Sequence, residues 1–170
     1  TAATLLVLLV ATGMRGMRHR DAWAEDRAHP VRHAFIAALP VALIIAATVG
    51  IGALGPTAAL HVLWWVGCVA QLAVTWWVMR RWWRSSTAAP SQGLSLAAAT
   101  PALVIPIVGN VLAPLAGVTL GHPAWSAAQF GIGLLFWPVV LVVIWVRVGT
   151  QGMYPPRLLP ANFIFIAPPA

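Results

Sequence analysis

Long apolar runs separated by short polar or Gly- and Pro-rich stretches constrain this chain more than any other feature of its sequence. The approximate predicted spans are 1–17, 31–53, 57–83, 94–120, 124–148 and 160–170. A helix needs roughly 20 apolar residues to cross about 30 Å of hydrocarbon, and the first and last runs are too short. The sequence therefore predicts one all-α integral membrane domain over residues 1–170, and we expect it to be a fragment of a longer protein.

Composition agrees with a membrane protein. Hydrophobic residues make up 61% of the chain and charged residues 8%, and the mean hydropathy is +0.86. About a quarter of the residues in a soluble domain are charged. Cys68 is the one cysteine, which excludes a disulfide within the chain. The net charge of +7 comes from arginine without lysine, which is compatible with nucleic acid or with a membrane surface.

The positions of the arginines decide between these two partners. The ten arginines flank the first, third and fifth connections between spans: Arg15, Arg18, Arg20, Arg27, Arg32, Arg80, Arg81, Arg84, Arg147 and Arg157. The second and fourth connections, GIGALGPT and LGHPAW, have none. By the positive-inside rule the odd connections are cytoplasmic. The pattern predicts a multi-pass protein of the inner (plasma) membrane whose partner is the lipid bilayer, not nucleic acid.

Prolines interrupt several of the predicted spans. Pro101, Pro106 and Pro114 fall in the fourth span, and Pro40 falls in the second. A proline inside a helix costs about 3 kcal/mol or more, and the carbonyl that it frees cannot face lipid. The predicted pore-lining residues are Pro40, Thr48, Pro101, Pro106, Gly109, Asn110 and Pro168. Simple packing kinks are the alternative. The predicted breaks fall on every second span, although Pro138 in the fifth span weakens this alternation.

Two further patterns leave alternatives open. Asn110 could donate an amide N–H to a passing anion or could form a helix-to-helix hydrogen bond. Small residues recur every fourth position as Ala38, Ala42, Ala46 and Gly50, and again as Gly109, Ala113 and Gly117. Such stripes predict close approach of helices in lipid, although the abundance of alanine explains them equally well.

Enzyme chemistry finds little support in the sequence. The three acids, Asp21, Glu25 and Asp26, share the first connection with His19, His29 and His33. His29 and His33 have the spacing of a metal-binding pair, but Pro30 disfavours helical geometry at His29. We therefore predict a solvated loop, no enzyme, no metal and no cofactor. A metal-dependent membrane enzyme and a structural assembly subunit remain the alternative functions.

The segments HPVRHAFIAALPVAL, TPALVIPIVGNVLAPLAG and YPPRLLPANFIFIAPPA resemble the tellurite-resistance/dicarboxylate transporter family, which is related to plant slow-type anion channels. The resemblance implies ten helices arranged as five hairpins around a pseudo-fivefold pore, and often a trimer. This chain would then hold helices two to six and the start of helix seven, without the ninth helix that carries the family's phenylalanine plug.

The implied activity is passive movement of anions through a channel or uniporter-like transporter. The family's substrates include chloride, nitrate, C4-dicarboxylates and sulfite, and some members confer tellurite resistance. Arg32 and Arg157 are the predicted pore-mouth residues, with anchoring to lipid headgroups as their alternative role.

Overall fold

The computed structural model describes residues 32–87 and 99–154, together with isolated positions 11, 13, 14, 18 and 21. The predicted spans 1–17 and 160–170 lie outside the two continuous stretches. Within these stretches every regular element is a helix, so the part of the chain that the structure describes is all-α, as predicted.

The elements follow one another as short and long helices. In chain order they are η1 (Arg32–Ala37), α3 (Ala38–Leu54), α4 (Ala58–Thr87), η3 (Pro101–Val104), α5 (Ile105–Val108), η4 (Gly109–Leu112), α6 (Pro114–Gly117) and α7 (Pro123–Gln151). Three described stretches are long and apolar enough to cross a membrane: His33–Leu54, Ala58–Arg81 and Pro123–Gln151. They occupy the regions of the spans predicted at 31–53, 57–83 and 124–148. We call Pro101–Gly117 the broken segment.

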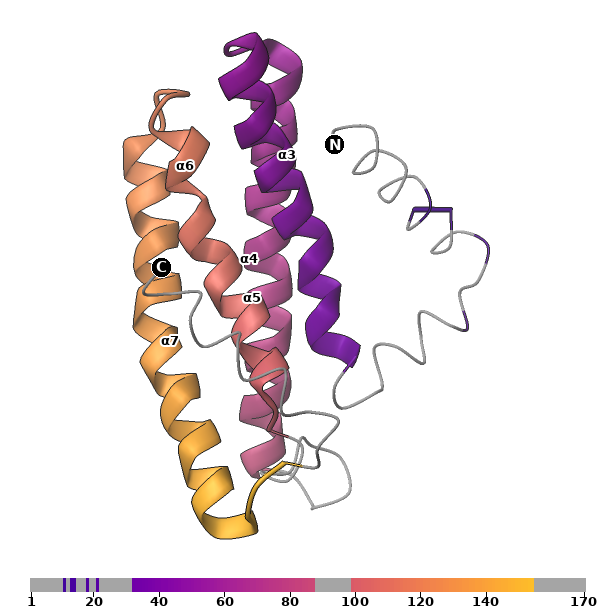
Figure 1. The fold of residues 1–170 in the computed structure, drawn as a ribbon, viewed down its shortest axis with the longest axis vertical. Coiled ribbons are helices and arrows are strands. Elements are labelled where there is room, and N and C mark those ends of the chain that lie inside the picture. Colours follow the sequence, from indigo (N-terminus) through magenta and orange to yellow (C-terminus); the bar gives the residue numbers. More distant parts are fainter. Residues whose placement is uncertain are drawn as a thin grey trace.

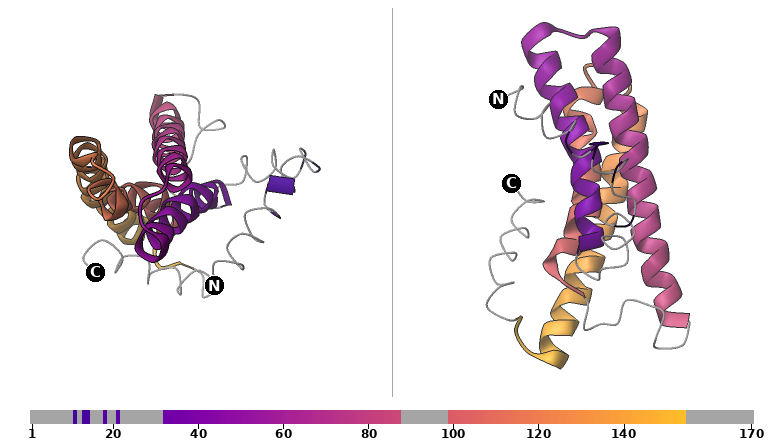
Figure 2. Two further views of the ribbon diagram at one scale, coloured as in Figure 1. Left: turned by 90° about the horizontal axis from the view of Figure 1, so that it is seen from above. Right: turned by 90° about the vertical axis from the view of Figure 1, so that its right-hand side faces the viewer.

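The helices form two antiparallel hairpins (Figure 1). In the first, α3 turns into α4 at Gly55, whose φ of 78° suits glycine. In the second, the broken segment turns into α7 at Gly121, whose φ is 81°. Both turns lie at the same end of the bundle, and Arg80, Arg81 and Arg147 lie toward the opposite ends of α4 and α7. Seen from above, the broken segment lies among α3, α4 and α7, and it contacts all three (Figure 2).

The broken segment is a series of short 3₁₀ and α-helical turns. In an α-helix the carbonyl of Ala102 would accept the N–H of residue 106, which proline lacks. Instead the N–H of Ile105 donates to it in a 3₁₀ turn. The same exchange precedes Pro114, because the N–H of Ala113 donates to the carbonyl of Asn110 at 3.4 Å. Directly before Pro106 and Pro114, a 3₁₀ turn therefore pairs the carbonyl that the missing proline N–H would otherwise leave without a donor.

Three of the prolines that the sequence placed inside spans do not interrupt a helix. Pro101 is the first residue of η3, after the extended residue Thr100. Pro40 lies in the first turn of α3, directly after the 3₁₀ turn η1, where backbone N–H groups lack an intrahelical partner. In place of the break predicted at Pro40, the structure has a change from the 3₁₀ helix η1 to the α-helix α3. Pro138 lies inside α7, which is continuous around it, and its ring is exposed on the outer face.

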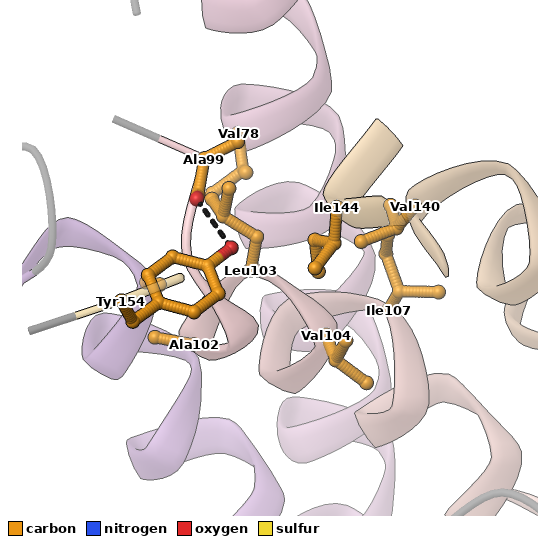
Figure 3. Packing of buried hydrophobic residues seen from close by; sticks show 10 residues of the cluster. Val78, Ala99, Ala102, Leu103, Val104, Ile107, Val140, Ile144 and Tyr154 are labelled. Carbon is orange, nitrogen blue, oxygen red and sulfur yellow. Dashed lines mark hydrogen bonds between the residues drawn. The ribbon is translucent and has the colours of Figure 1, made fainter. Parts of the chain in front are cut away.

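Two apolar clusters fill the space between the helices. The cluster nearer the arginine-bearing end joins Val78 of α4 to the broken segment and to Val140 and Ile144 of α7 (Figure 3). The other cluster packs Ile44 of α3 and Trp64 of α4 against the far end of the broken segment. The broken segment contributes to both clusters, so it forms the centre of the described part of the molecule.

Small residues allow this close packing in the broken segment. Gly109, Ala113 and Gly117 are all buried, as the predicted stripe requires. A Cβ added at Gly117 would collide with Ser126 and with the ring of Trp64. The stripe predicted on α3 is not the buried face of that helix. Ala38 is exposed, and the residues that α3 buries are Pro40, Ile44, Ala47 and Ile51.

We expect Gly117→Ala to lower the free energy of unfolding by about 1–3 kcal/mol, because the added methyl group overpacks the contact with the rigid indole of Trp64. Gly131→Ala is the matched control in α7, since an added Cβ there has no atom within 4 Å. The control should be unchanged or up to about 1 kcal/mol more stable. Denaturant unfolding in detergent micelles measures both, and equal effects would contradict the packing model.

Candidate functional site

A network of buried polar side chains surrounds the break. The carbonyl oxygen of Pro106 accepts hydrogen bonds from Gln71 Nε2 at 2.7 Å and Thr75 Oγ1 at 2.6 Å, both on α4. It also accepts a bond from Asn110 Nδ2 at 3.1 Å. An unpaired carbonyl in hydrocarbon costs several kcal/mol. Side chains of a neighbouring helix therefore satisfy the backbone where the helix is irregular.

Asn110 links the break to both long helices beside it. Its amide Nδ2 donates to Thr75 Oγ1 at 2.8 Å, and its Oδ1 accepts a bond from Gln129 Nε2 of α7 at 3.2 Å. Gln129 Nε2 also donates to the carbonyl of Cys68 at 3.2 Å, and its Oε1 accepts the indole N–H of Trp125 at 2.9 Å. The amide of Asn110 thus forms the helix-to-helix bonds that the sequence left as one of two options.

The network is sealed from solvent in the described structure. Gln71, Asn110 and Gln129 are at most 1% exposed, and Thr75 is 4% exposed. All four are uncharged, so the network needs no counterion. Gln71 Oε1 is buried and has no hydrogen-bond partner among the described residues. The chemistry available here is that of neutral amides, a hydroxyl group and backbone carbonyls.

The predicted pore-lining and pore-mouth residues separate into three groups. Pro40, Pro101, Pro106, Gly109 and Asn110 are buried among the helices. Thr48 is half-buried, and its hydroxyl donates to the carbonyl of Ile44 in the same helix at 2.9 Å. Pro168 and Arg157 lie outside the described residues, as does the side chain of Arg32. Pore lining by these residues stays a prediction.

One face of the broken segment is covered less than the rest. Ile105, Val108 and Leu112 are half-buried, and Leu115 is 59% exposed. Their spacing of three, four and three residues places them on one side of a helical path. This apolar face, which we call the open face, is the part of the broken segment that its neighbours in the described structure cover least.

A separate group of contacts, centred on Arg147 and Tyr154, joins the segment that follows α7 to the segment that precedes η3. The guanidinium of Arg147 lies 4.0 Å from the ring centroid of Tyr154, and its Nη1 donates to the carbonyl of Gly152 at 2.7 Å. The hydroxyl of Tyr154 donates to the carbonyl of Ala99 at 2.8 Å (Figure 3). Burial raises the pKa of the Tyr154 phenol, and the charge of Arg147 opposes part of that rise.

Three residues of this network, Gln71, Thr75 and Gln129, were not predicted from the sequence. They lie 35, 31 and 19 residues from their partners in the broken segment, so no local motif joins them to it. The available signal was a glutamine within each of two predicted spans, Gln71 in 57–83 and Gln129 in 124–148. A polar side chain within a span needs a partner inside the protein.

Metal ligands for an enzyme are not gathered in the part of the chain that the structure describes. No group of three or more His, Cys, Asp or Glu residues lies close enough there to hold an ion. His33 is buried, and its ring meets Trp77 edge-on with centroids 6.0 Å apart. His19 and His29, the other histidines of the metal hypothesis, lie outside the described residues.

These helices define a multi-pass, all-α membrane protein with a proline-broken segment held at its centre. A family model described as voltage-dependent anion channel matches residues 1–170, and the chain belongs to this family. The family resemblance stated from the sequence is therefore confirmed.

Two plant relatives have partial similarity to the chain. S-type anion channel SLAH2 of Arabidopsis thaliana is 35% identical over 72 residues, which cover 42% of this chain and 14% of that protein. S-type anion channel SLAH1 of the same organism is 24% identical over 108 residues, which cover 64% of this chain and 27% of that protein. The matched part is thus a minor share of each relative.

We expect Asn110→Leu to destabilise the protein by about 1–3 kcal/mol, because the change leaves Gln129 and Thr75 with fewer buried partners. Thr150→Val is the control, since the Thr150 hydroxyl donates to a carbonyl of its own helix at an exposed site. The control should change stability by less than about 0.5 kcal/mol. Unfolding in micelles measures both variants, and a neutral Asn110→Leu would show that the network carries no net stability.

The raised pKa of Tyr154 predicts that the folded protein loses stability in alkali. Because the pKa of Tyr154 is higher in the folded state, folding favours the neutral phenol. The stability that the neutral phenol contributes is complete below the ordinary pKa of about 10, and it is lost as pH rises through the pKa of the folded state. Tyr154→Phe should lose about 0.5–1.5 kcal/mol at neutral pH with the bond to Ala99, and the gap should narrow above about pH 10. Thermal unfolding from about pH 8 to about pH 11 measures the difference. A gap independent of pH would contradict the burial of the phenol.

Proposed function

We propose that this chain forms part of an anion channel or uniporter-like transporter in which anions pass down their gradient beside the broken segment. The observation that carries the proposal is the break itself. Its carbonyls are satisfied by 3₁₀ turns and by side chains of α4, which suits an irregular backbone beside a path. Membership of the voltage-dependent anion channel family supports the same activity.

The open face is our candidate for the lining of this path. Ile105, Val108, Leu112 and Leu115 are apolar, whereas Pro106, Gly109 and Asn110 hold the break against α4 and α7. Under this proposal Pro106, Gly109 and Asn110, which the sequence predicted as lining residues, shape and support the lining and do not themselves face the path. Residues 32–87 and 99–154 contain no Asp or Glu, so the described helices present no carboxylate that would repel an anion.

Charge at the cytoplasmic end would draw anions to the path. Arginines cluster toward one end of the described helices, and Arg32 and Arg157 remain our proposed mouth residues. Weak contacts inside the path suit conduction, since a strong cationic site would hold the ion too long. Chloride, nitrate, C4-dicarboxylates and sulfite are the substrates proposed from the resemblance, together with a plasma-membrane location and a trimer.

The test uses cysteines on the open face. In the whole protein with Cys68→Ala, we expect Val108→Cys and Leu112→Cys to react with an anionic methanethiosulfonate reagent and to lose most of their anion flux in liposomes. Water must reach a thiol for this reaction, because the thiolate is the nucleophile. Val142→Cys and Leu135→Cys are matched controls on the outer face of α7, where the native side chains are 60% and 65% exposed.

The controls should conduct and stay unmodified, since lipid covers that face of α7. Flux that persists after modification of the open-face cysteines would place the path elsewhere. An unmodified whole protein that gives no anion flux would overturn the channel proposal and leave the assembly subunit as the remaining function.

A further inference from the structure

The two hairpins meet at their arginine-free end through a pair of histidines. His61 lies in the first turn of α4, and His122 immediately precedes α7. Their Nε2 atoms are hydrogen-bonded at 2.6 Å although 61 residues separate them in the chain. Neither histidine takes part in the polar network at the break, and the sequence offered no motif that pairs them.

Both histidines are held by ordered backbone. His122 lies between Gly121, with its φ of 81°, and Pro123, the first residue of α7. Its N–H donates to the carbonyl of Gly117 at 2.8 Å, and its carbonyl accepts the N–H of Ser126 at 3.1 Å. The N–H of His61 donates to the carbonyl of Thr57 at 2.9 Å. The paired rings therefore project from fixed positions on two different hairpins.

Tryptophans form a wall beside the pair. The ring of His122 stacks on Trp64, with centroids 5.6 Å apart and planes 8° from parallel, and meets Trp65 edge-on at 5.0 Å. Trp125 packs on Trp65 at 4.9 Å. This wall fixes the orientation of the imidazole. Both histidines are half-buried in the described structure.

We propose that His61 and His122 bind a divalent first-row transition-metal ion, with Zn²⁺ as the representative, through their Nε2 atoms. Imidazole nitrogen suits zinc, copper and nickel, and zinc–nitrogen bonds are about 2.0–2.1 Å long. In tetrahedral coordination, two nitrogens at that bond length lie about 3.3 Å apart. Binding the ion replaces the hydrogen bond between the two rings and moves their Nε2 atoms apart from the present 2.6 Å.

The ion would connect the two hairpins at the end opposite the arginines. Water would fill its other coordination positions, because the described surroundings of the pair are aromatic. This proposal departs from the sequence-based expectation that the chain holds no metal ligands. It concerns a site on the bundle's end and is independent of anion conduction, so failure of the flux experiments does not affect it.

The test titrates Zn²⁺ into the whole protein in detergent and measures binding by calorimetry. The unmodified protein should bind one ion per chain at this site, and its unfolding temperature should rise with Zn²⁺ concentration by mass action. His61→Gln and His122→Gln should each weaken binding by about tenfold or more and should abolish the rise.

Two further measurements identify the ligands. Cu²⁺ bound to the unmodified protein should show an electron paramagnetic resonance signal split by two imidazole nitrogens, and each single variant should show one. His29→Gln is the control, because this histidine belongs to the arginine-rich first connection, and it should bind Zn²⁺ normally. Loss of binding in His29→Gln, or no saturable Zn²⁺ binding by the unmodified protein, overturns the proposal whether or not the other variants fold.

Discussion

The fold of this chain depends on the need to pair every backbone carbonyl that lies at membrane depth. A proline removes an N–H donor and leaves the acceptor of the preceding turn in place, and lipid offers no substitute. The chain meets this need in two ways. First, the N–H groups of Ile105 and Ala113, the residues immediately before Pro106 and Pro114, close 3₁₀ turns. Second, side chains of α4 donate hydrogen bonds to the carbonyl of Pro106.

The second solution determines how the helices pack. Gln71 and Thr75 can reach the Pro106 carbonyl only if α4 lies directly against the break, and Gly109 provides the space, since a Cβ there would collide with Gln71. Gln129 imposes the same condition on α7, because its amide contacts Asn110 and Cys68 together. At Gly133 of α7 an added Cβ would lie 2.7 Å from Val111. Polar pairing and small residues thus hold the broken segment at the centre.

Much of this arrangement could be predicted from the sequence, because composition and local rules govern it. Proline positions located the break, apolar runs located the long helices, and the arginines distinguished the two ends. The partners of the break could not be predicted, since their contacts are set by which helix faces meet. The effects of Pro40 and Pro138 could not be predicted either, because the cost of a proline depends on its position within the helix and on what the surrounding helix face contacts. The buried face of α3 likewise follows from the packing of Ile44 and Ala47, which the alanine spacing does not reveal.

The distribution of polarity bears on how an anion would be conducted. Asn110 donates to Thr75 and to the carbonyls of Pro106 and Ile107, so its amide N–H groups already have partners within the protein. Releasing them to an ion would break the bonds to Thr75 and to the carbonyl of Ile107, and each buried acceptor left unpaired costs about 1–3 kcal/mol. The carbonyl of Pro106 would keep its bonds from Gln71 and Thr75. An anion beside the open face would instead meet apolar side chains and the summed field of the arginines. Under the proposed function, selectivity for anions over cations then arises from this long-range positive potential, and passage stays fast because no single group holds the ion.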